Sequence, residues 1–125
     1  MRDEIISVIG GSGFLGRYVV RRLAAQGFRV RVLCRKPHLA DFLKPAGNVG
    51  QIVLDYMDLA KPDTVAGKLD GSYGVINLVG LLFESGSQKF AKIHAQGAEK
   101  LAQEAKKAGA QVFVQVSALG VEQAH

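Results

Sequence analysis

The most constraining feature of this sequence is a glycine-rich turn between a short apolar run and an amphipathic stretch. Ile5–Ile9 is rich in β-branched residues, which predicts a buried parallel strand. The glycines that follow are spaced G-x-x-G-x-x-G, at Gly10, Gly13 and Gly16. From Phe14 onward, apolar residues recur with a helical period. A strand, a glycine turn and a helix in this order predict a β-to-α unit whose turn can bind a phosphate group.

Short apolar runs and helical periods alternate along the whole chain. Four further strands are predicted, at Arg29–Cys34, Val49–Leu54, Val75–Val79 and Val112–Val116. Helices are predicted from Phe14 to a stop at Gly27, around Leu39–Leu43, over Pro62–Leu69 and over Gln88–Ala108, with Asp55–Asp58 as a loop. This alternation predicts a three-layer α/β fold of the Rossmann type, in which a five-stranded parallel sheet of order 3-2-1-4-5 has helices on both faces. Residues 1–125 are expected to form one domain.

Each glycine of the turn has a separate use in a dinucleotide site. Gly10 permits a tight turn out of the strand, and Gly13 has no Cβ, so the backbone can approach a pyrophosphate. Gly16 lets the helix lie close to the sheet. Free N–H groups at the helix start, around Phe14 and Leu15, face the phosphate charge. The alternative is an ordinary strand-to-helix turn, but the preceding strand and the following amphipathic helix favour a binding turn.

The residues after the second predicted strand bear on the choice of nucleotide. A site for NAD usually has Asp or Glu about 20 residues beyond the turn, where it binds the ribose 2′-hydroxyl. This chain has Leu33-Cys34-Arg35-Lys36 there, with no acid. Arg35 can pair with a 2′-phosphate and Lys36 adds positive charge, which favours NADP(H) and leaves NAD(H) as the second choice. The alternative is a pair of solvated surface cations.

Composition and charge argue against several other classes of protein. The net charge is +5, yet no block of five or six like charges occurs, which disfavours nucleic-acid binding. A single cysteine, Cys34, allows no disulfide within the chain, and no stretch approaches a transmembrane helix. No metal site is expected, because the three histidines lack ligand spacing. The N-terminus has no targeting segment, so we expect a cytoplasmic protein. The densest basic groups are Arg29/Arg31/Arg35/Lys36 and Lys100/Lys106/Lys107.

Further segments at the ends of the predicted strands carry a family resemblance. With the turn Gly10–Gly16, these are Asp58-Leu59, Asn77-Leu78-Val79-Gly80 and Val116-Ser117-Ala118. Together they resemble the extended and atypical short-chain dehydrogenase/reductase superfamily, whose members bind NAD(P). The resemblance implies that Asp58 hydrogen-bonds the adenine amine and Leu59 packs on the ring. It also implies that Asn77 and Gly80 line the cofactor, and that Ser117 is a catalytic serine facing the nicotinamide.

Each of these residues also has a purely structural interpretation. Asp58 could be a loop carboxylate, Asn77 a strand-end cap, and Ser117 a small residue that closes a buried strand. Their common position at strand ends favours the binding roles, because ligands of open α/β folds sit at the carboxyl ends of the strands.

Five longer segments carry a closer resemblance: GGSGFLGRYVVRRL, VLCRKP, VINLVGLLFESG, FAKIHAQGA and VSALGV. They are similar to the nucleotide-binding accessory subunits of respiratory complex I (NADH-ubiquinone oxidoreductase) and to their bacterial relatives, the NAD-dependent epimerase/dehydratases. This resemblance implies a cofactor with a mainly structural role and other complex I subunits as partners. For a bacterial protein it implies a cytoplasmic location, with peripheral attachment at the inner membrane as the alternative.

One element of the superfamily is missing from the sequence. Its catalytic Tyr-x-x-x-Lys pair follows the serine strand, and the Lys lowers the pKa of the Tyr that moves the substrate proton. Tyr18, Tyr56 and Tyr73 precede Ser117 and have no Lys four residues later. We therefore expect residues 1–125 to be the N-terminal part of a longer protein, inactive alone and able to form a homodimer through an uncovered sheet edge.

Two other functions stay open on this sequence. One is the first part of an active oxidoreductase or epimerase/dehydratase, whose Tyr-x-x-x-Lys lies beyond residue 125. The other is a regulatory sensor of the NADP(H) redox state.

Overall fold

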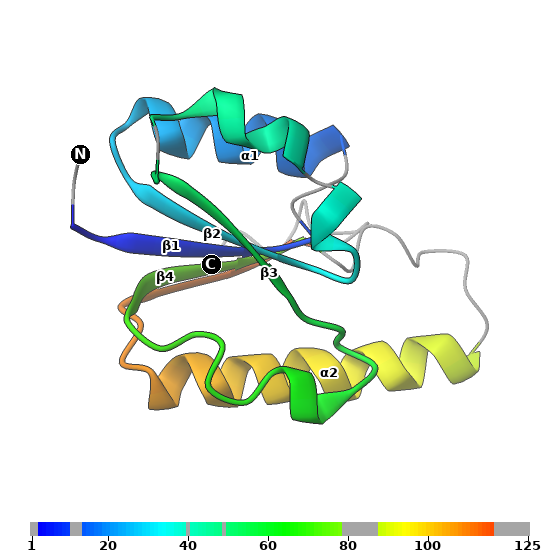
Figure 1. The fold of residues 1–125 in the computed structure, drawn as a ribbon. Coiled ribbons are helices and arrows are strands. Elements are labelled where there is room, and N and C mark those ends of the chain that lie inside the picture. Colours follow the sequence, from blue (N-terminus) through cyan, green and yellow to red (C-terminus); the bar gives the residue numbers. More distant parts are fainter. Residues whose placement is uncertain (1–2, 11–13, 40, 49, 79–87, 117–125) are drawn as a thin grey trace.

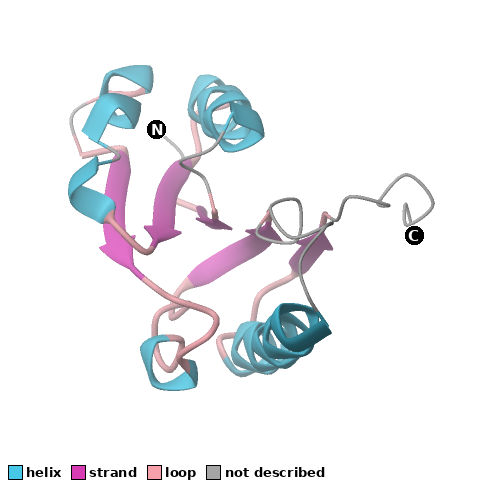
Figure 2. Cartoon of the chain, turned by 90° about the vertical axis from the view of Figure 1, so that its right-hand side faces the viewer, coloured by secondary structure: helices cyan, strands magenta, loops and turns pink. Residues whose placement is uncertain are grey.

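A five-stranded parallel sheet lies at the centre of the computed structural model, between two layers of helices (Figure 1). Its strand order, β3-β2-β1-β4-β5, confirms the predicted Rossmann-type fold. In the view turned by 90°, helices lie on both sides of the strands (Figure 2). The structure describes residues 3–10, 14–39, 41–48, 50–78 and 88–116.

All neighbouring strands pair in parallel. The strands are β1 (Ile5–Ile9), β2 (Arg29–Cys34), β3 (Ile52–Tyr56), β4 (Ser72–Asn77) and β5 (Val112–Gln115). β1 and β2 have the predicted bounds, and β5 starts at the predicted residue. The amino ends of all five strands therefore meet at one edge of the sheet and the carboxyl ends at the other.

The predicted strand Val49–Leu54 is displaced along the chain in the structure. β3 continues through Asp55 and Tyr56, so their prediction as loop is wrong. The reason is register, because Asp55 pairs with Leu33 and Tyr56 with Cys34 in the ladder to β2. These backbone hydrogen bonds outweigh the polar character of Asp55.

β4 is displaced in the other direction. It starts at Ser72 and ends at Asn77, before the end of the predicted strand Val75–Val79. Ser72 pairs with Ile5 at the start of β1. The Ser72 hydroxyl also lies 2.6 Å from the hydroxyl of Ser7, and both side chains are buried. A polar pair that satisfies itself inside the sheet has no signature in an apolar pattern.

Helix α1 (Phe14–Ala25) covers one face of the sheet. Gly16, Val20 and Ala24 are buried at intervals of four residues, which places them on one face of the helix. Gly16 and Ala24 are small, so this face can lie close to the strands. The core beneath α1 contains Ile6, Val8, Val30, Val32 and Ile52.

Helix α2 (Gln88–Lys107) covers the opposite face and has nearly the predicted bounds. The core on this side contains Ile9, Leu33, Met57, Leu59, Val65, Leu69, Val75, Leu101 and Ala105. Leu33 and Val32 are neighbours in β2 and both are fully buried, because each faces a different helix layer. No helix in the described part of the chain is long and apolar enough to cross a membrane.

The two short helices predicted between strands are wrong in type and extent. Among the described residues of these connections, the structure has 3₁₀ turns at Pro37–Leu39, Asp41–Ala46 and Pro62–Thr64. Pro45 lies inside the second of these turns, where its missing N–H opposes a regular α-helix.

Candidate cofactor site at the carboxyl edge of the sheet

Backbone hydrogen bonds join the carboxyl ends of all five strands into one continuous edge. In each bond, the residue directly after one strand donates its backbone N–H to a carbonyl oxygen near the end of the neighbouring strand. The pairs are Met57 N–H to Cys34 O (3.0 Å), Gly10 N–H to Leu33 O (3.1 Å), Leu78 N–H to Ile9 O (2.9 Å) and Val116 N–H to Asn77 O (2.9 Å). The predicted binding residues of four separate segments thereby lie along the same edge, at Gly10, Arg35, Asp58 and Asn77.

The turn after β1 has a backbone that suits glycine. Gly10 has a φ of +83°, a conformation that other residues rarely adopt. Its N–H is already bonded to Leu33, so the amides that could meet a phosphate are those at the start of α1. Gly13 lies outside the described residues. α1 begins at Phe14, directly beyond the turn.

The first turn of α1 is compatible with an anion. Leu15 is 38% exposed and Gly16 is buried. No acidic residue occupies the first turn of the helix. The partial positive charge of the helix start is therefore not neutralised by a side chain of that turn.

The predicted 2′-phosphate group residues lie next to this turn. Arg35 and Lys36 are both exposed and follow β2 directly. The hydrogen bond from the Gly10 N–H to the Leu33 carbonyl oxygen joins the turn to β2, and Leu33 comes two residues before Arg35. Cys34, which lies between Leu33 and Arg35, is buried. Burial raises the pKa of its thiol, although the backbone N–H of Lys36 opposes that rise. Cys34 is therefore a protonated packing residue and not a nucleophile.

Asp58 is held by a small hydrogen-bond network in the loop after β3. The hydroxyl of Thr64 accepts the Asp58 N–H (2.9 Å) and lies 2.8 Å from the Asp58 carbonyl oxygen. One oxygen of the Asp58 carboxylate, Oδ1, accepts the N–H of Ala60 (3.0 Å). The carboxylate is thus fixed in direction by one oxygen, and its other oxygen can accept a ligand N–H.

Leu59 is placed differently from its neighbour. Its side chain is only 5% exposed and belongs to the core beneath α2. A Cβ added to Gly97 of α2 would lie 2.5 Å from the Leu59 carbonyl oxygen and 2.7 Å from the Leu59 Cβ. The helix therefore touches the backbone of this loop directly. Because most of its side chain is inside, Leu59 can offer an adenine ring little more than its backbone and its exposed edge.

Asn77 is the last residue of β4 and its side chain is 1% exposed. Its amide nitrogen donates to the side-chain oxygen of Gln115 on β5, at 3.0 Å. Asn77 and Gln115 are direct partners in the parallel ladder, so this bond follows from the register. The two other predicted residues at this end of the edge, Gly80 and Ser117, lie outside the described residues.

Sequence reasoning missed three residues that position the site, namely Thr64, Gly97 and Gln115. Thr64 had a weak signal, since a threonine hydroxyl often bonds a carbonyl three residues earlier, as it does here with Lys61 (2.8 Å). Gly97 stands in the middle of a predicted helix, where glycine is unfavourable and so indicates a close contact. Gln115 had no signal, because its partner depends on the register of β4 and β5.

The likeness to known proteins agrees with this geometry. Residues 10–125 match a protein family described as NAD(P)H-binding. The chain is 32% identical over 116 residues to the mitochondrial NADH-ubiquinone oxidoreductase 40 kDa subunit of Neurospora crassa, covering 93% of this chain and 31% of that protein. It is 30% identical over 119 residues to the ceramide reductase of Caulobacter vibrioides, covering 95% of this chain and 36% of that protein.

A solved structure supports the fold as well. A mutant uronate dehydrogenase from Agrobacterium tumefaciens, complexed with NAD, matches with a TM-score of 0.73 at 25% identity, over 91% of this chain and 40% of that chain. The chain spans about a third of the length of the two curated relatives, 31% and 36%.

Proposed function

Because this chain belongs to the family of NAD(P)H-binding domains, we propose that it holds NADP(H) along the carboxyl edge of its sheet, mainly as a structural cofactor. The observation that carries the proposal is the continuous edge, which brings Gly10, Arg35, Asp58 and Asn77 together from four different strands. Ligands of open α/β sheets bind at this edge, beside the strand where the order reverses. That strand is β1, and the glycine turn follows it.

The strand order defines how a dinucleotide would lie. Its adenine end would rest over β2 and β3, beside Asp58 and Arg35, and its pyrophosphate at the start of α1. Its nicotinamide end would extend over β4 and β5, toward Asn77, Gly80 and Ser117. From β3 to β5 the edge spans four inter-strand spacings, about 19 Å. The nicotinamide supplies hydride chemistry when bound, and the residues of this chain supply its binding and orientation.

The preference for NADP(H) over NAD(H) rests on the charge beside β2. Arg35 and Lys36 are exposed basic residues next to the turn. A guanidinium group can bind a phosphate through two parallel hydrogen bonds.

Two substitutions test this binding mode. Arg35→Asp should weaken NADPH binding by about tenfold or more and NADH binding much less, because only NADPH has the 2′-phosphate. Arg21→Asp, which changes an exposed arginine in the middle of α1, is the matched control and should affect neither. Isothermal titration calorimetry on the chain measures all four affinities. Equal losses for NADPH and NADH in the Arg35 variant would remove Arg35 from the 2′-phosphate role.

Gly13→Val tests the turn itself. A Cβ at this position should block both nucleotides at the pyrophosphate, whatever their 2′ group. Unchanged binding of NADPH and NADH by the Gly13 variant would refute the assignment of the turn.

A structural cofactor has a thermodynamic consequence. NADPH at a hundredfold excess over its Kd should stabilise the chain by ~2.7 kcal/mol without any turnover. The relative in Neurospora is a subunit of NADH-ubiquinone oxidoreductase, which supports a role within a similar assembly, with complex I subunits as partners. For a bacterial protein that assembly would place it in the cytoplasm, at the inner-membrane surface.

The second candidate is the first part of an active oxidoreductase or epimerase/dehydratase. The reductase from Caulobacter among the relatives favours it. In this case residues 1–125 would be the nucleotide-binding part of a longer protein, with Tyr-x-x-x-Lys beyond residue 125. Hydride transfer measured with this chain should stay at background, and a rate well above background would contradict our preference for the structural role.

A homodimer is a further part of the proposal. β5 is an outer strand of the sheet, and Val112, Phe113 and Val114 are each more than a third exposed. Pairing of two β5 edges would cover these side chains. Light scattering coupled to size-exclusion chromatography should then show twice the monomer mass, and a monomer at all concentrations would refute it.

A further inference from the structure

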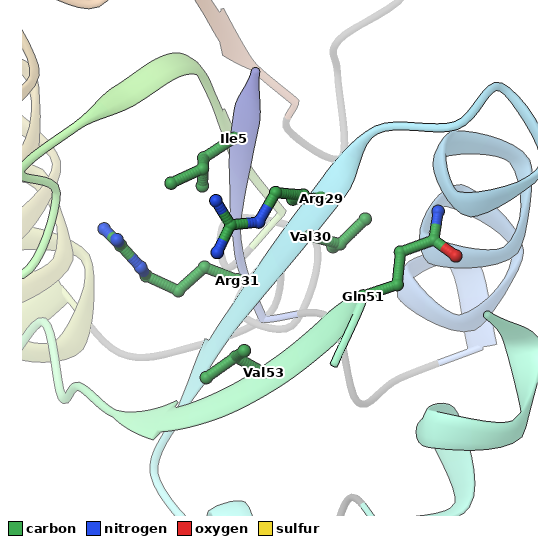
Figure 3. A pocket seen from close by; sticks show the side chains of 6 residues that line it. All are labelled: Ile5, Arg29, Val30, Arg31, Gln51 and Val53. Carbon is green, nitrogen blue, oxygen red and sulfur yellow. The ribbon is translucent and has the colours of Figure 1, made fainter. Parts of the chain in front are cut away.

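A pocket lies at the opposite, amino edge of the sheet. It is lined by residues from the starts of β1, β2 and β3 and by the residue just before β3, namely Ile5, Arg29, Val30, Arg31, Gln51 and Val53 (Figure 3). Its volume is about 90 Å³, the size of a few heavy atoms. The length of β1, five residues, separates it from the glycine turn by about 16 Å. It is therefore outside the dinucleotide site.

Two arginines of β2 give this pocket its chemistry. Arg29 and Arg31 leave the strand on the same side, whereas Val30 and Gln51 point the other way (Figure 3). The Arg31 guanidinium is fixed in place, because its Nη1 donates to the carbonyl oxygens of Lys68 (2.8 Å) and Asp70 (3.0 Å). Its other N–H groups are not used by these two bonds. Arg31 is therefore a pre-organised donor.

Arg29 is the second donor group. It is exposed, and among the described residues its side chain makes neither a hydrogen bond nor an ion pair. Gln51 lines the pocket, but its side chain is 3% exposed and its polar atoms already make hydrogen bonds within the protein. Its amide nitrogen donates to the carbonyl oxygens of Ala24 (2.9 Å) and Phe28 (2.8 Å), and its side-chain oxygen accepts the Asn48 N–H. The spare polar groups of the lining side chains are thus guanidinium N–H donors.

Nearby acids leave this positive charge in place. The carboxylate of Asp55 on β3 is paired through its Oδ1 with the Lys68 ammonium at 3.0 Å. Burial opposes ionisation, but the hydrogen bond from Lys68, the N–H of Tyr56 and the charges of Lys68 and Arg31 together hold the pKa of Asp55 below its ordinary value. Asp55 is therefore ionised and already matched by Lys68, so Arg29 remains for an external anion.

We propose that this pocket binds a small carboxylate with a short branched apolar group. The two guanidinium groups are hydrogen-bond donors, so their ligand must supply acceptor atoms. The two oxygens of a carboxylate do so and can bind one guanidinium in bidentate geometry. The apolar lining on the side of the two arginines is Ile5 and Val53, and Val53 is 49% exposed. An inorganic phosphate would satisfy the arginines but leave these carbons in water. The inference stands independently of the proposed cofactor.

Isovalerate is a suitable probe, and isovaleramide is its uncharged counterpart of the same shape. Titration of the ¹⁵N-labelled chain should give saturable shifts of the amides around Arg29 and Val53, with a Kd of about 1 mM for a ligand of this size. Isovaleramide should bind at least about tenfold more weakly, because it lacks the charge. Inorganic phosphate should also bind more weakly than isovalerate.

Arg29→Gln should weaken isovalerate about tenfold. Arg21→Gln, an exposed arginine of α1, is the control and should leave the Kd unchanged. Because Arg29 is exposed and its side chain makes no hydrogen bond or ion pair to the described residues, the variant should fold, and its thermal midpoint checks this. NADPH affinity of the Arg29 variant should stay at the unsubstituted value, which separates this site from the cofactor site. Equal binding of the acid and the amide, equal losses in both arginine variants, or tighter binding of phosphate would each overturn the proposal.

Discussion

Replacing Gly97 by alanine should destabilise the fold, even though alanine is the better helix former. The added Cβ would lie 2.5 Å from the Leu59 carbonyl oxygen, whereas an ordinary contact is 3.4 Å or more. The helix and the loop must therefore separate by about 0.9 Å. The neighbour is backbone, so no side-chain rotation can relieve the contact.

The size of the effect follows from two opposing contributions. Overpacking a core contact costs about 3 kcal/mol when backbone must move. The exchange of glycine for alanine inside a helix returns about 1 kcal/mol. The net loss should be about 2 kcal/mol in the free energy of unfolding, or about 6–10 °C in Tm for a chain of this length. The Asp58–Leu59 loop would move with it, so both nucleotides should bind more weakly.

Urea denaturation followed by circular dichroism measures the stability directly. Ala102→Gly, at an exposed position of α2, is the control for helix propensity and should cost about 1 kcal/mol. Helix propensity alone would make the Gly97→Ala variant more stable, whereas the contact with Leu59 should make it less stable. An unchanged or raised stability of the Gly97 variant would show that α2 does not lie against the Leu59 backbone, and the reasoning would fail.

Two further substitutions test the contacts around the site. Thr64→Val keeps the shape of the side chain but leaves the Asp58 N–H without its acceptor, so stability should fall by about 1–2 kcal/mol in denaturant melts. Binding of NADPH and NADH should weaken equally there, unlike in the Arg35 variant. The side chain of Glu104 is 7% exposed. The hydrogen bond from Lys100 keeps the pKa of Glu104 below its ordinary value, helped by the Gly67 N–H and the charge of Lys107, although burial opposes this. A lowered folded-state pKa contributes stability above the unfolded pKa of about 4.3 and loses it as pH falls through the folded pKa. Glu104→Gln should therefore be less stable than the unsubstituted chain at pH 7 and approach it at pH 3, and a gap that does not narrow in melts at the two pH values would contradict this.

Much of the fold can be predicted from local sequence patterns. β1 and β2 have the predicted bounds because β1 is a β-branched run closed by glycine, and β2 has alternating valines and is followed by charged residues. The strand order follows from right-handed crossovers and the glycine turn after β1. β3 and β4 differ from the prediction because their ends depend on pairing with β2 and β1, which the linear pattern does not contain.

The candidate site divides in the same way. Arg35 was predicted from its place after a strand, and Asp58 and Asn77 from the family resemblance together with their place near strand ends. All three lie at one edge because parallel strands end there. Thr64, Gly97 and Gln115 were not predicted, since each acts through a partner on a different element. Leu59 was predicted to contact a ligand because of its position beside Asp58, but its side chain is buried in the core. The sequence does not show which of two neighbouring side chains points into the core.

The binding of a dinucleotide along the carboxyl edge can be measured directly by titrating NADPH into the ¹⁵N-labelled chain and following assigned amides. The account predicts saturable shifts for the amides of Gly10, Gly16, Arg35, Asp58 and Leu78, while those of Ile5 and Ser72 at the far edge stay in place. Shifts confined to the far edge, or none at nucleotide concentrations that saturate related domains, would contradict it.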